Sequence, residues 1–544
     1  MNMTDAARLE QLMSLMCESI ALGLAQQTQL ALARADEGLA LQPDFFPLQM
    51  QRGRLLQEQG HYAEAAAAYQ HCLNTRPDLA EAGWARERAL LAAVQQCEQQ
   101  LRTATDTSDI SHFVLQRAQA LHALGRHVEA LDGLAGIHAG RAGDFDVLNL
   151  QADILLHLNR HEEALACYVR VSAEGADFSE PLLHFNRGNV LRQMGRMQDA
   201  LAAYEQALAA YPQFAEARVA RGHILLMHGQ YEEGWREHEA RRDIALLKQN
   251  ELRSLSPRWQ AGFADMAALH QKTVLLWAEQ GLGDTLQFAR YIPLVAAMAS
   301  QVIVCVPPSL KTLLESVCVQ AVAEGRCRFI DNDKELPPHD LYCSLISLPL
   351  MLEKFAPAAA GGAAYLAADP VLREQWAQRL EDAIAEKRPS AAPRLRIGLA
   401  WAGRQYGTVN HSRDMRLAHL QPLFDLDADF ISLQQSLPEP DVAVAEELPA
   451  LHSFALEDWS QTAALLANLD LVIAVDTSIA HLAGALGKPL CLMLRLEGEW
   501  RWGVAPHTTD WYASAHLFRQ SQRGEWGAVV AAVRDYCAGL IAVA

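Results

Sequence analysis

The feature that most constrains the fold of this chain is a repeat with a period of about 34 residues in its N-terminal half. The clearest copy, GRLLQEQGHYAEAAAAYQHCLNTRP, starts at Gly53, and a second copy with the same offsets starts at Gly188. Each copy has room for two helices, joined at Gly60 or Gly195 by a tight turn that favours glycine. Weaker copies, with a degenerate helical stretch near residues 80–110, extend the pattern. The sequence therefore predicts stacked helix pairs over residues 1–245.

The offsets of glycine, alanine and tyrosine in these copies resemble the tetratricopeptide repeat. Ala65, Ala200, Tyr69 and Tyr204 hold equivalent places in the two clearest copies. The resemblance implies an α-helical repeat superhelix whose concave face usually holds a peptide or protein. A purely structural or dimerising array is the alternative. An unpaired end of such an array could form a homo-oligomer, so the sequence leaves the oligomeric state open.

Composition and charge exclude several classes of protein. A net charge of −19 argues against nucleic-acid binding, which needs a basic surface. The ten cysteines form no C-x-x-C pair, so they predict neither a zinc site nor a disulfide framework. The first residues have no basic segment before an apolar core, and no apolar run reaches transmembrane length. We expect a cytoplasmic protein.

From about residue 250 the pattern changes to short apolar runs that alternate with helical segments. TVLLWA, QVIVCVP, CRFID and DLYCSLIS precede a polar, proline-bearing linker, Ala385–Arg394, and LRIGLAWAG, DFISLQQ, LDLVIAVD and PLCLML follow it. The pattern predicts two Rossmann-like α/β domains, residues 250–388 and 394–544. Ligands of such folds bind outside the carboxyl ends of the strands, so functional residues should follow the apolar runs.

The first of these runs leads into a glycine loop, LLWAEQGLGDTLQFARY. Gly281 and Gly283 match part of a dinucleotide fingerprint, but Leu286 stands where the third glycine belongs. Asp284 lies where a pyrophosphate would be expected, and a carboxylate is a poor partner for phosphate. The loop, with Glu279 before it, is therefore not predicted to hold a nucleotide.

The sharpest motif of the second domain is LDLVIAVDTSIAHLAGALGKPLCLML. A strand ends at Asp476, and Thr477 and Ser478 stand where a helix begins, which makes this turn an anion site. His481 is expected early in this helix, on the side that faces the strand ends. The structural alternative is that Asp476 caps the helix and His481 packs in the core.

Two further segments have basic or aromatic residues after strands. The stretch Trp401–Leu420 holds Arg404, His411, Arg413 and Arg416, a plausible counter-charge for phosphate or else a solvated loop. GEWRWG, around Arg501, and DWYASAHLFRQ place aromatic rings beside arginines. Such rings suit stacking on a base or sugar, or equally the packing of the last helix.

Four of these segments together carry a resemblance: EQGLGDTLQFARY, GLAWAG, DTSIAHLAGALGKP and WYASAHLFRQ. The chain resembles bacterial tetratricopeptide-repeat proteins with a heptosyltransferase-like glycosyltransferase domain. The architecture is also similar to that of O-linked N-acetylglucosamine transferases. The resemblance implies the GT-B fold, in which two Rossmann-like domains face each other across a cleft. It also implies a nucleotide-diphosphate sugar as co-substrate, with no metal and no other cofactor.

The resemblance also assigns roles to residues. Asp284 matches the acceptor-side base, and Asp476, Thr477, Ser478 and His481 match the donor-diphosphate loop, although the family usually has glycine where Ser478 stands. Glu279 and His481 are the competing candidates for the base. The expected acceptor-side loop contains Glu279, Gly281 and Gly283. The expected donor-binding set is Trp401, Arg404, Arg413, Gln434, Asp476, Thr477, Ser478, His481, Lys488 and Arg501.

The mechanism expected from this set is inversion, with helix N–H groups and basic side chains stabilising the diphosphate that leaves. The first hypothesis for function is a glycosyltransferase whose acceptor is a protein bound by the repeats. The second is the same enzyme acting on a glycan or a lipid-linked saccharide. The third is a non-catalytic scaffold whose transferase half has decayed.

Overall fold

The computed structural model describes residues 5–76, 78–135, 137, 145–173, 181–244, 247, 251–252, 254–260, 266–332, 334–361, 364–388, 393–403 and 415–542. The chain divides into two compact units, Met1–Leu191 and Arg192–Ala544, which we call the N-terminal and C-terminal units. Within the described residues, no helix is both long and apolar enough to span a membrane.

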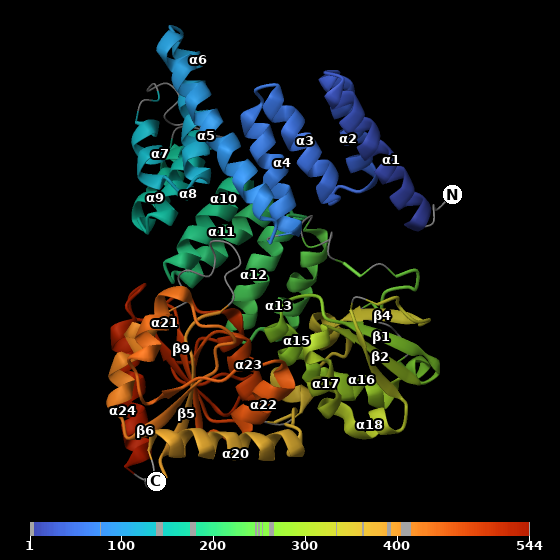
Figure 1. Cartoon of the computed structure of the whole chain (residues 1–544), viewed down its shortest axis with the longest axis vertical. Helices are drawn as coiled ribbons and strands as arrows, with labels where there is room; N and C mark the ends of the chain where they lie inside the picture. The colour runs from blue at the N-terminus through green and yellow to red at the C-terminus, as the bar shows by residue number, and fades with distance from the viewer. Residues whose placement is uncertain are drawn as a thin grey trace. The chain divides into compact units, whose positions relative to one another are not determined.

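The N-terminal unit is built from antiparallel helix pairs (Figure 1). Its helices are α1 (Asp5–Leu24), α2 (Thr28–Leu41), α3 (Phe46–Glu58), α4 (Tyr62–Thr75), α5 (Ala80–Thr103), α6 (Thr107–Ala123), α7 (His127–Leu134), α8 (Phe145–His157) and α9 (His161–Ala173), followed by α10 (Pro181–Gln193), which ends just past the unit boundary. The degenerate stretch near 80–110 forms the long helix α5 and the start of α6.

Backbone angles confirm the predicted turns at Gly60 and Gly195 and show the same turn at two further glycines. Gly60, Gly125, Gly195 and Gly229 have φ between +74° and +79°, the left-handed region that closes a helix without a Cβ clash. Asn159 occupies the same place in a weaker copy, with φ of +59°. The glycine that starts the clearest repeat copy is also explained by the structure. A Cβ on Gly53 would lie 2.6 Å from the ring of Tyr69, so the two helices can approach this closely only at a glycine.

The C-terminal unit begins with the last repeat helices and continues into two parallel sheets. Its first helices are α11 (Met197–Ala210), α12 (Ala215–Met227) and α13 (Tyr231–His238). The first sheet contains β1 (Thr273–Trp277), β2 (Gln301–Val306), β3 (Cys327–Asp331) and β4 (Leu341–Ser344), in the order β3-β2-β1-β4. Its helices are α15 (Leu282–Phe288), α16 (Ile292–Met298), α17 (Pro308–Leu314), α18 (Val319–Ala323) and α19 (Leu348–Met351), with α20 (Pro370–Lys387) leading to the second sheet.

The second sheet contains β5 (Leu395–Ala400), β6 (Ala428–Ser432), β7 (Leu451–His452), β8 (Leu471–Val475), β9 (Leu490–Leu494) and β10 (Ala515–Arg519), all parallel. Its helices are α21 (Glu439–Glu446), α22 (Trp459–Ala467), α23 (Ser478–Ala485) and α24 (Trp526–Ile541). Short 3-10 helices include η2 (Glu239–Asp243), η9 (Leu417–Asp425) and η10 (Trp500–Trp502). The strand order β10-β9-β8-β5-β6-β7 is the 3-2-1-4-5-6 order of the Rossmann fold.

These elements confirm the predicted fold class, a helical repeat array followed by α/β sheets, and two boundaries differ from those predicted. The proposed linker Ala385–Arg394 starts within a helix, since α20 runs to Lys387. The compact units separate at residue 191/192 and not near 245. A single apolar core explains the second difference, because it joins Leu226 and Trp235 of the last repeat to residues of both sheets.

Candidate active site

The glycine loop after β1 and the helix start after β8 lie together between the two sheets. Helix α15 contacts α23, and Figure 1 shows the two helices between the sheets. A Cβ on Gly283 would lie 2.9 Å from Cδ2 of His481 and 3.6 Å from Oγ of Ser478. Only a residue without a side chain fits this contact. The structure therefore brings together two motifs that are almost 200 residues apart in the sequence.

Asp284 lies in the first turn of α15 and forms an ion pair with Arg501 of η10. The guanidinium also donates to Glu499 at 2.7 Å and to Oε1 of Gln287 at 2.9 Å. Burial lowers the pKa of Arg501, but the carboxylates of Asp284, Glu499 and Asp476 outweigh burial and raise it above its ordinary value. Arg501 is therefore a permanent, partly buried cation that links the two motifs.

His481 lies one turn into α23, and its predicted place on the strand-end side is consistent with its contacts. Its ring stacks on Trp502 with centroids 5.1 Å apart, and Nδ1 is 2.9 Å from the hydroxyl of Tyr512. Only 5% of the residue is exposed. The close contact with Gly283 leaves the ring little freedom to turn.

The N-terminus of α23 keeps a polar group without a partner. Thr477 occupies the N-cap position and makes no capping hydrogen bond. Among the residues that the structure describes, its buried hydroxyl has no hydrogen-bond partner, and the same holds for Nε2 of Gln287 and Nε1 of Trp502. A buried polar atom without a partner is costly, so three of them at one junction point to a ligand that supplies the missing bonds.

The carboxylate of Glu279 is bound by a buried arginine and does not face the junction of α15 and α23. Both of its carboxylate oxygens accept hydrogen bonds of 2.8 Å from Arg241, which follows the last repeat helix. Arg241 is 1% exposed and also donates to Ser347 and Glu239. Burial raises the pKa of Glu279, but Arg241 lowers it more, so the carboxylate stays ionised and bound. The other expected member of this loop, Gly281, is the N-cap residue of α15.

Two of the expected donor-binding residues, Trp401 and Lys488, lie away from the junction of α15 and α23. The indole of Trp401 is fully buried and donates to Asp441 at 2.8 Å, because the strand before it carries the ring into the core of the second sheet. Lys488 precedes β9, at the amino ends of the strands, and its ammonium donates to the carbonyl oxygen of Ala467 at 3.3 Å. Neither side chain reaches the junction of α15 and α23.

The remaining members of the donor set follow β5 and β6. Oε1 of Gln434 accepts from the backbone N–H of Ala402 at 3.4 Å, so this amide lies beside the loop that follows β5. Arg404 and Arg413, with His411 of the same loop, lie outside the described residues. The structure therefore supports Gln434 only as a neighbour of that loop.

The aromatic residues around Arg501 form the packing wall and not an open stacking platform. Trp500, Trp502, Trp511 and Tyr512 are each less than 5% exposed. The last repeat contributes to this wall, since the ring of Trp235 lies 5.4 Å from that of Trp500 and His223 stacks on Trp500.

Sequence reasoning missed one residue that holds the junction closed. Arg290, in the same segment as Asp284, lies over the rings of Tyr365, Trp511 and Tyr512 and donates to the carbonyl of Trp511 at 3.0 Å. Its place six residues after Asp284 in the quoted motif was the available signal. Arg290 thus clamps the helix that carries Asp284 onto the second sheet's aromatic wall.

Comparisons with known proteins agree with this architecture. Residues 455–494, which contain β8, α23 and β9, match the model of glycosyltransferase family 9 (heptosyltransferase). Residues 46–79 and 181–214 match models of the tetratricopeptide repeat. Protein FlbA of Caulobacter vibrioides is 25% identical over 516 residues, which cover 88% of this chain and 82% of that protein.

The solved structures similar to the chain include a tetratricopeptide repeat protein and MamA. A tetratricopeptide repeat protein from Parabacteroides merdae is 16% identical, covers 44% of this chain and 98% of its own, and has a TM-score of 0.26. MamA is 15% identical, covers 36% of this chain and 93% of its own, and has a TM-score of 0.23.

Proposed function

We propose that this chain, a tetratricopeptide-repeat protein with a glycosyltransferase domain of the heptosyltransferase type, transfers a sugar with inversion from a nucleotide-diphosphate sugar to a hydroxyl of a protein acceptor. The transfer needs no metal in this proposal, and the repeats recruit the acceptor. The observation that carries it is the meeting of Asp284, Arg501 and the N-terminus of α23 between the two sheets.

The charges at this junction support a donor diphosphate on its α23 side. The N-terminus of an α-helix offers free N–H groups and a positive dipole end to an anion. The unpartnered hydroxyl of Thr477 adds a donor at the same place. Arg501 supplies a permanent positive charge within reach of Asp476, which follows β8. Together these groups would stabilise the charge that develops on the leaving diphosphate.

The acceptor hydroxyl needs a base, and Asp284 is the best placed of the three candidates. Glu279 has both oxygens bound by Arg241, and His481 is buried between Trp502, Tyr512 and Gly283. Asp284 keeps 17% of its side chain exposed, and in the part of the chain that the structure describes it forms an ion pair with Arg501. When the diphosphate binds, we propose that Arg501 turns toward it and releases the carboxylate to take the hydroxyl proton.

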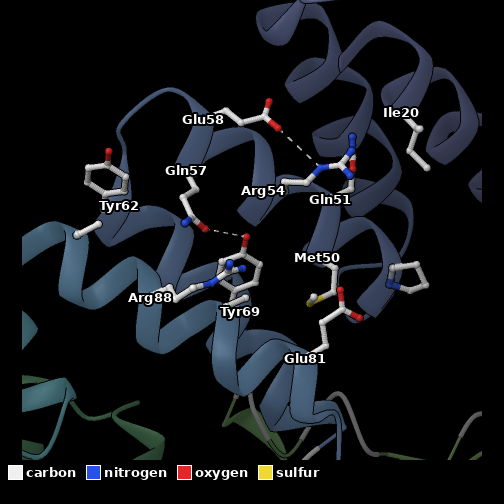
Figure 2. Close-up of a pocket in the computed structure, with 13 residues that line it drawn as sticks. Ile20, Met50, Gln51, Arg54, Gln57, Glu58, Tyr62, Tyr69, Glu81 and Arg88 are labelled. Carbon is white, nitrogen blue, oxygen red and sulfur yellow. Dashed lines mark hydrogen bonds and ion pairs between the residues drawn. The ribbon is translucent and has the colours of Figure 1, made fainter. Parts of the chain in front are cut away.

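A groove in the N-terminal unit is suited to the acceptor role of the repeats. Helices α1, α3, α4 and α5 enclose a hollow of about 600 Å³, the size of a pocket for a few side chains. Figure 2 shows its mixed lining, with Met50 and Glu81 on one side, Arg88 beside Tyr69, and Arg54 paired with Glu58. Apolar, basic and acidic groups in one hollow fit a peptide segment with apolar and charged side chains.

The experiment compares Asp284→Asn with Asp535→Asn, an exposed aspartate on the last helix. Nucleoside diphosphate release would be measured with a panel of nucleotide sugars, with and without cell protein as acceptor. Loss of the base should lower kcat by about 10²- to 10⁴-fold in the first variant and leave the second unchanged. Equal rates in wild type and Asp284→Asn would show that the base assignment is wrong.

Two outcomes distinguish the other hypotheses. If no nucleotide or nucleotide sugar binds by calorimetry, the transferase half is a scaffold. If transfer occurs but intact-mass spectra of cell proteins are the same with and without the gene, the acceptor is a glycan or a lipid-linked saccharide.

A further inference from the structure

Three histidines and an aspartate meet in the N-terminal unit, on helices α6, α7 and α8. His122 ends the last turn of α6, His127 begins α7, and Asp153 and His157 lie on α8. Asp153 and His157 are four residues apart, so a helix places both on one face. The cluster has no role in the proposed transfer reaction.

The distances within this cluster match those of a metal-ligand set. One ligand atom from each of His122, Asp153 and His157 lies within 4.8 Å of the others. Nε2 of His122 is 3.0 Å from Oδ2 of Asp153. The ring of His157 lies beside the same carboxylate, with its Nδ1 3.7 Å from Oδ1. A tetrahedral Zn²⁺ with bonds of about 2.0–2.1 Å holds neighbouring ligand atoms about 3.3 Å apart. The closest pair is therefore already near a bound geometry.

Hydrogen bonds outside the set orient two of the imidazoles. Nδ1 of His157 lies 2.9 Å from the carbonyl oxygen of Asp153, which can only accept, so Nδ1 carries the proton and Nε2 keeps its lone pair. Nδ1 of His122 lies 3.1 Å from Nδ1 of His127. Partners of this kind fix the tautomer and orientation of metal-binding histidines in known sites.

The three imidazole rings of the cluster pack against one another. The ring centroids of His122, His127 and His157 all lie 4.8–4.9 Å from one another. The rings of His127 and His157 are stacked, and the ring of His122 meets that of His157 edge-on. The three rings therefore converge on one place, where imidazole nitrogens from two helix pairs can share an ion.

We propose that His122, Asp153 and His157 bind one divalent transition metal of the Zn²⁺ class, with His127 as the positioning residue for His122. Imidazole nitrogens suit Zn²⁺, and one carboxylate reduces the net charge of the site. The ligands come from α6 and α8, so the ion joins two consecutive helix pairs of the array. The site is structural and independent of the proposed glycosyl transfer.

The test is calorimetric titration of the full-length, metal-stripped protein with Zn²⁺, in the wild type and in Asp153→Asn and His157→Gln. Both altered side chains are partly exposed, so the fold should survive. The wild type should bind one Zn²⁺ per chain and unfold at a higher temperature with the ion. Each ligand variant should lose more than about tenfold in affinity, and His127→Gln about 10- to 100-fold.

Two control variants separate this site from other ligands. His61→Gln alters an exposed histidine that pairs with Glu64 in another repeat, and it should bind Zn²⁺ like the wild type. Cys17→Ser removes the exposed thiol and should do the same. The proposal is overturned if the wild type shows no saturable binding, if the ligand variants bind as tightly as the wild type, or if Cys17→Ser abolishes binding.

Discussion

A substitution at Gly484 tests how tightly the candidate site is packed. Gly484 lies inside α23, and a Cβ there would lie 2.3–2.8 Å from three ring carbons of Tyr512. Tyr512 is 1% exposed and its hydroxyl contacts His481. Ordinary contact between carbon atoms needs about 3.5–4.0 Å, so the ring or the helix has to move by about an ångström. Gly484→Ala should therefore disturb the wall behind the candidate site.

Two opposing effects set the size of the change. Alanine favours a helix interior over glycine by about 0.8–1.0 kcal/mol. Overpacking of a filled core typically costs about 1–3 kcal/mol and occasionally more, and an overlap of this depth belongs at the upper end. We expect Gly484→Ala to lower the free energy of unfolding of the C-terminal unit by about 1–2 kcal/mol.

Gly539→Ala is the matched control, since Gly539 lies in α24 with nothing within 4 Å of its Cβ position. The same gain in helix propensity acts there without the clash, so this variant should be as stable as the wild type or up to about 1 kcal/mol more stable. Denaturant unfolding followed by tryptophan fluorescence reports on the C-terminal unit, because ten of the eleven tryptophans, all except Trp84, belong to it. A Gly484→Ala protein as stable as the Gly539→Ala protein would refute the packing argument.

Two further predictions concern charge. Burial is the main cause that lowers the pKa of His223 to about 4, so the folded protein binds fewer protons there than the unfolded chain, whose histidine titrates near about 6.5. The stability of the C-terminal unit should therefore fall as the pH drops from about 6.5 to 4. In unfolding curves measured at several pH values, His223→Gln should recover at most about 3 kcal/mol of that lost stability. A variant with the same pH profile as the wild type would contradict the assignment. Lys488→Met should alter nucleotide-sugar affinity by less than about twofold in calorimetry, because the ammonium bonds Ala467 at the amino ends of the strands; a large loss of affinity would return Lys488 to the donor site.

Much of the fold could be predicted because its signals are local. The turn glycines repeat at fixed offsets, and apolar runs followed by polar residues mark parallel strands and their carboxyl ends. The meeting of Asp284 with the DTSIAH turn follows from the same rule, since both motifs end strands in facing sheets. The two-residue strand β7 and the strand β10 lacked a signal distinct from the loops around them.

The errors arose where a local motif does not determine which way a side chain faces. Trp401 follows a strand as a ligand-binding residue would, but the pleat turns its ring into the core. Lys488 belongs to the motif DTSIAHLAGALGKP. The helix α23 within this motif runs back along the sheet, so Lys488 lies at the amino ends of the strands, opposite the candidate site. Glu279 looked like a base until the distant Arg241 was seen to bind it. Tertiary partners decide each of these roles, and single-sequence patterns do not contain them.

The core shared by the last repeat and the two sheets limits how this protein can exchange parts with its relatives. A chain cut near residue 250 would uncover Phe288, Trp500 and Trp511, which pack around Trp235. It would also leave the buried carboxylate of Glu279 without Arg241, a loss of about 3–5 kcal/mol for a buried pair. A fusion of the transferase to a different repeat array must therefore keep helices α11–α13. The junction of such a fusion should lie upstream of Arg192.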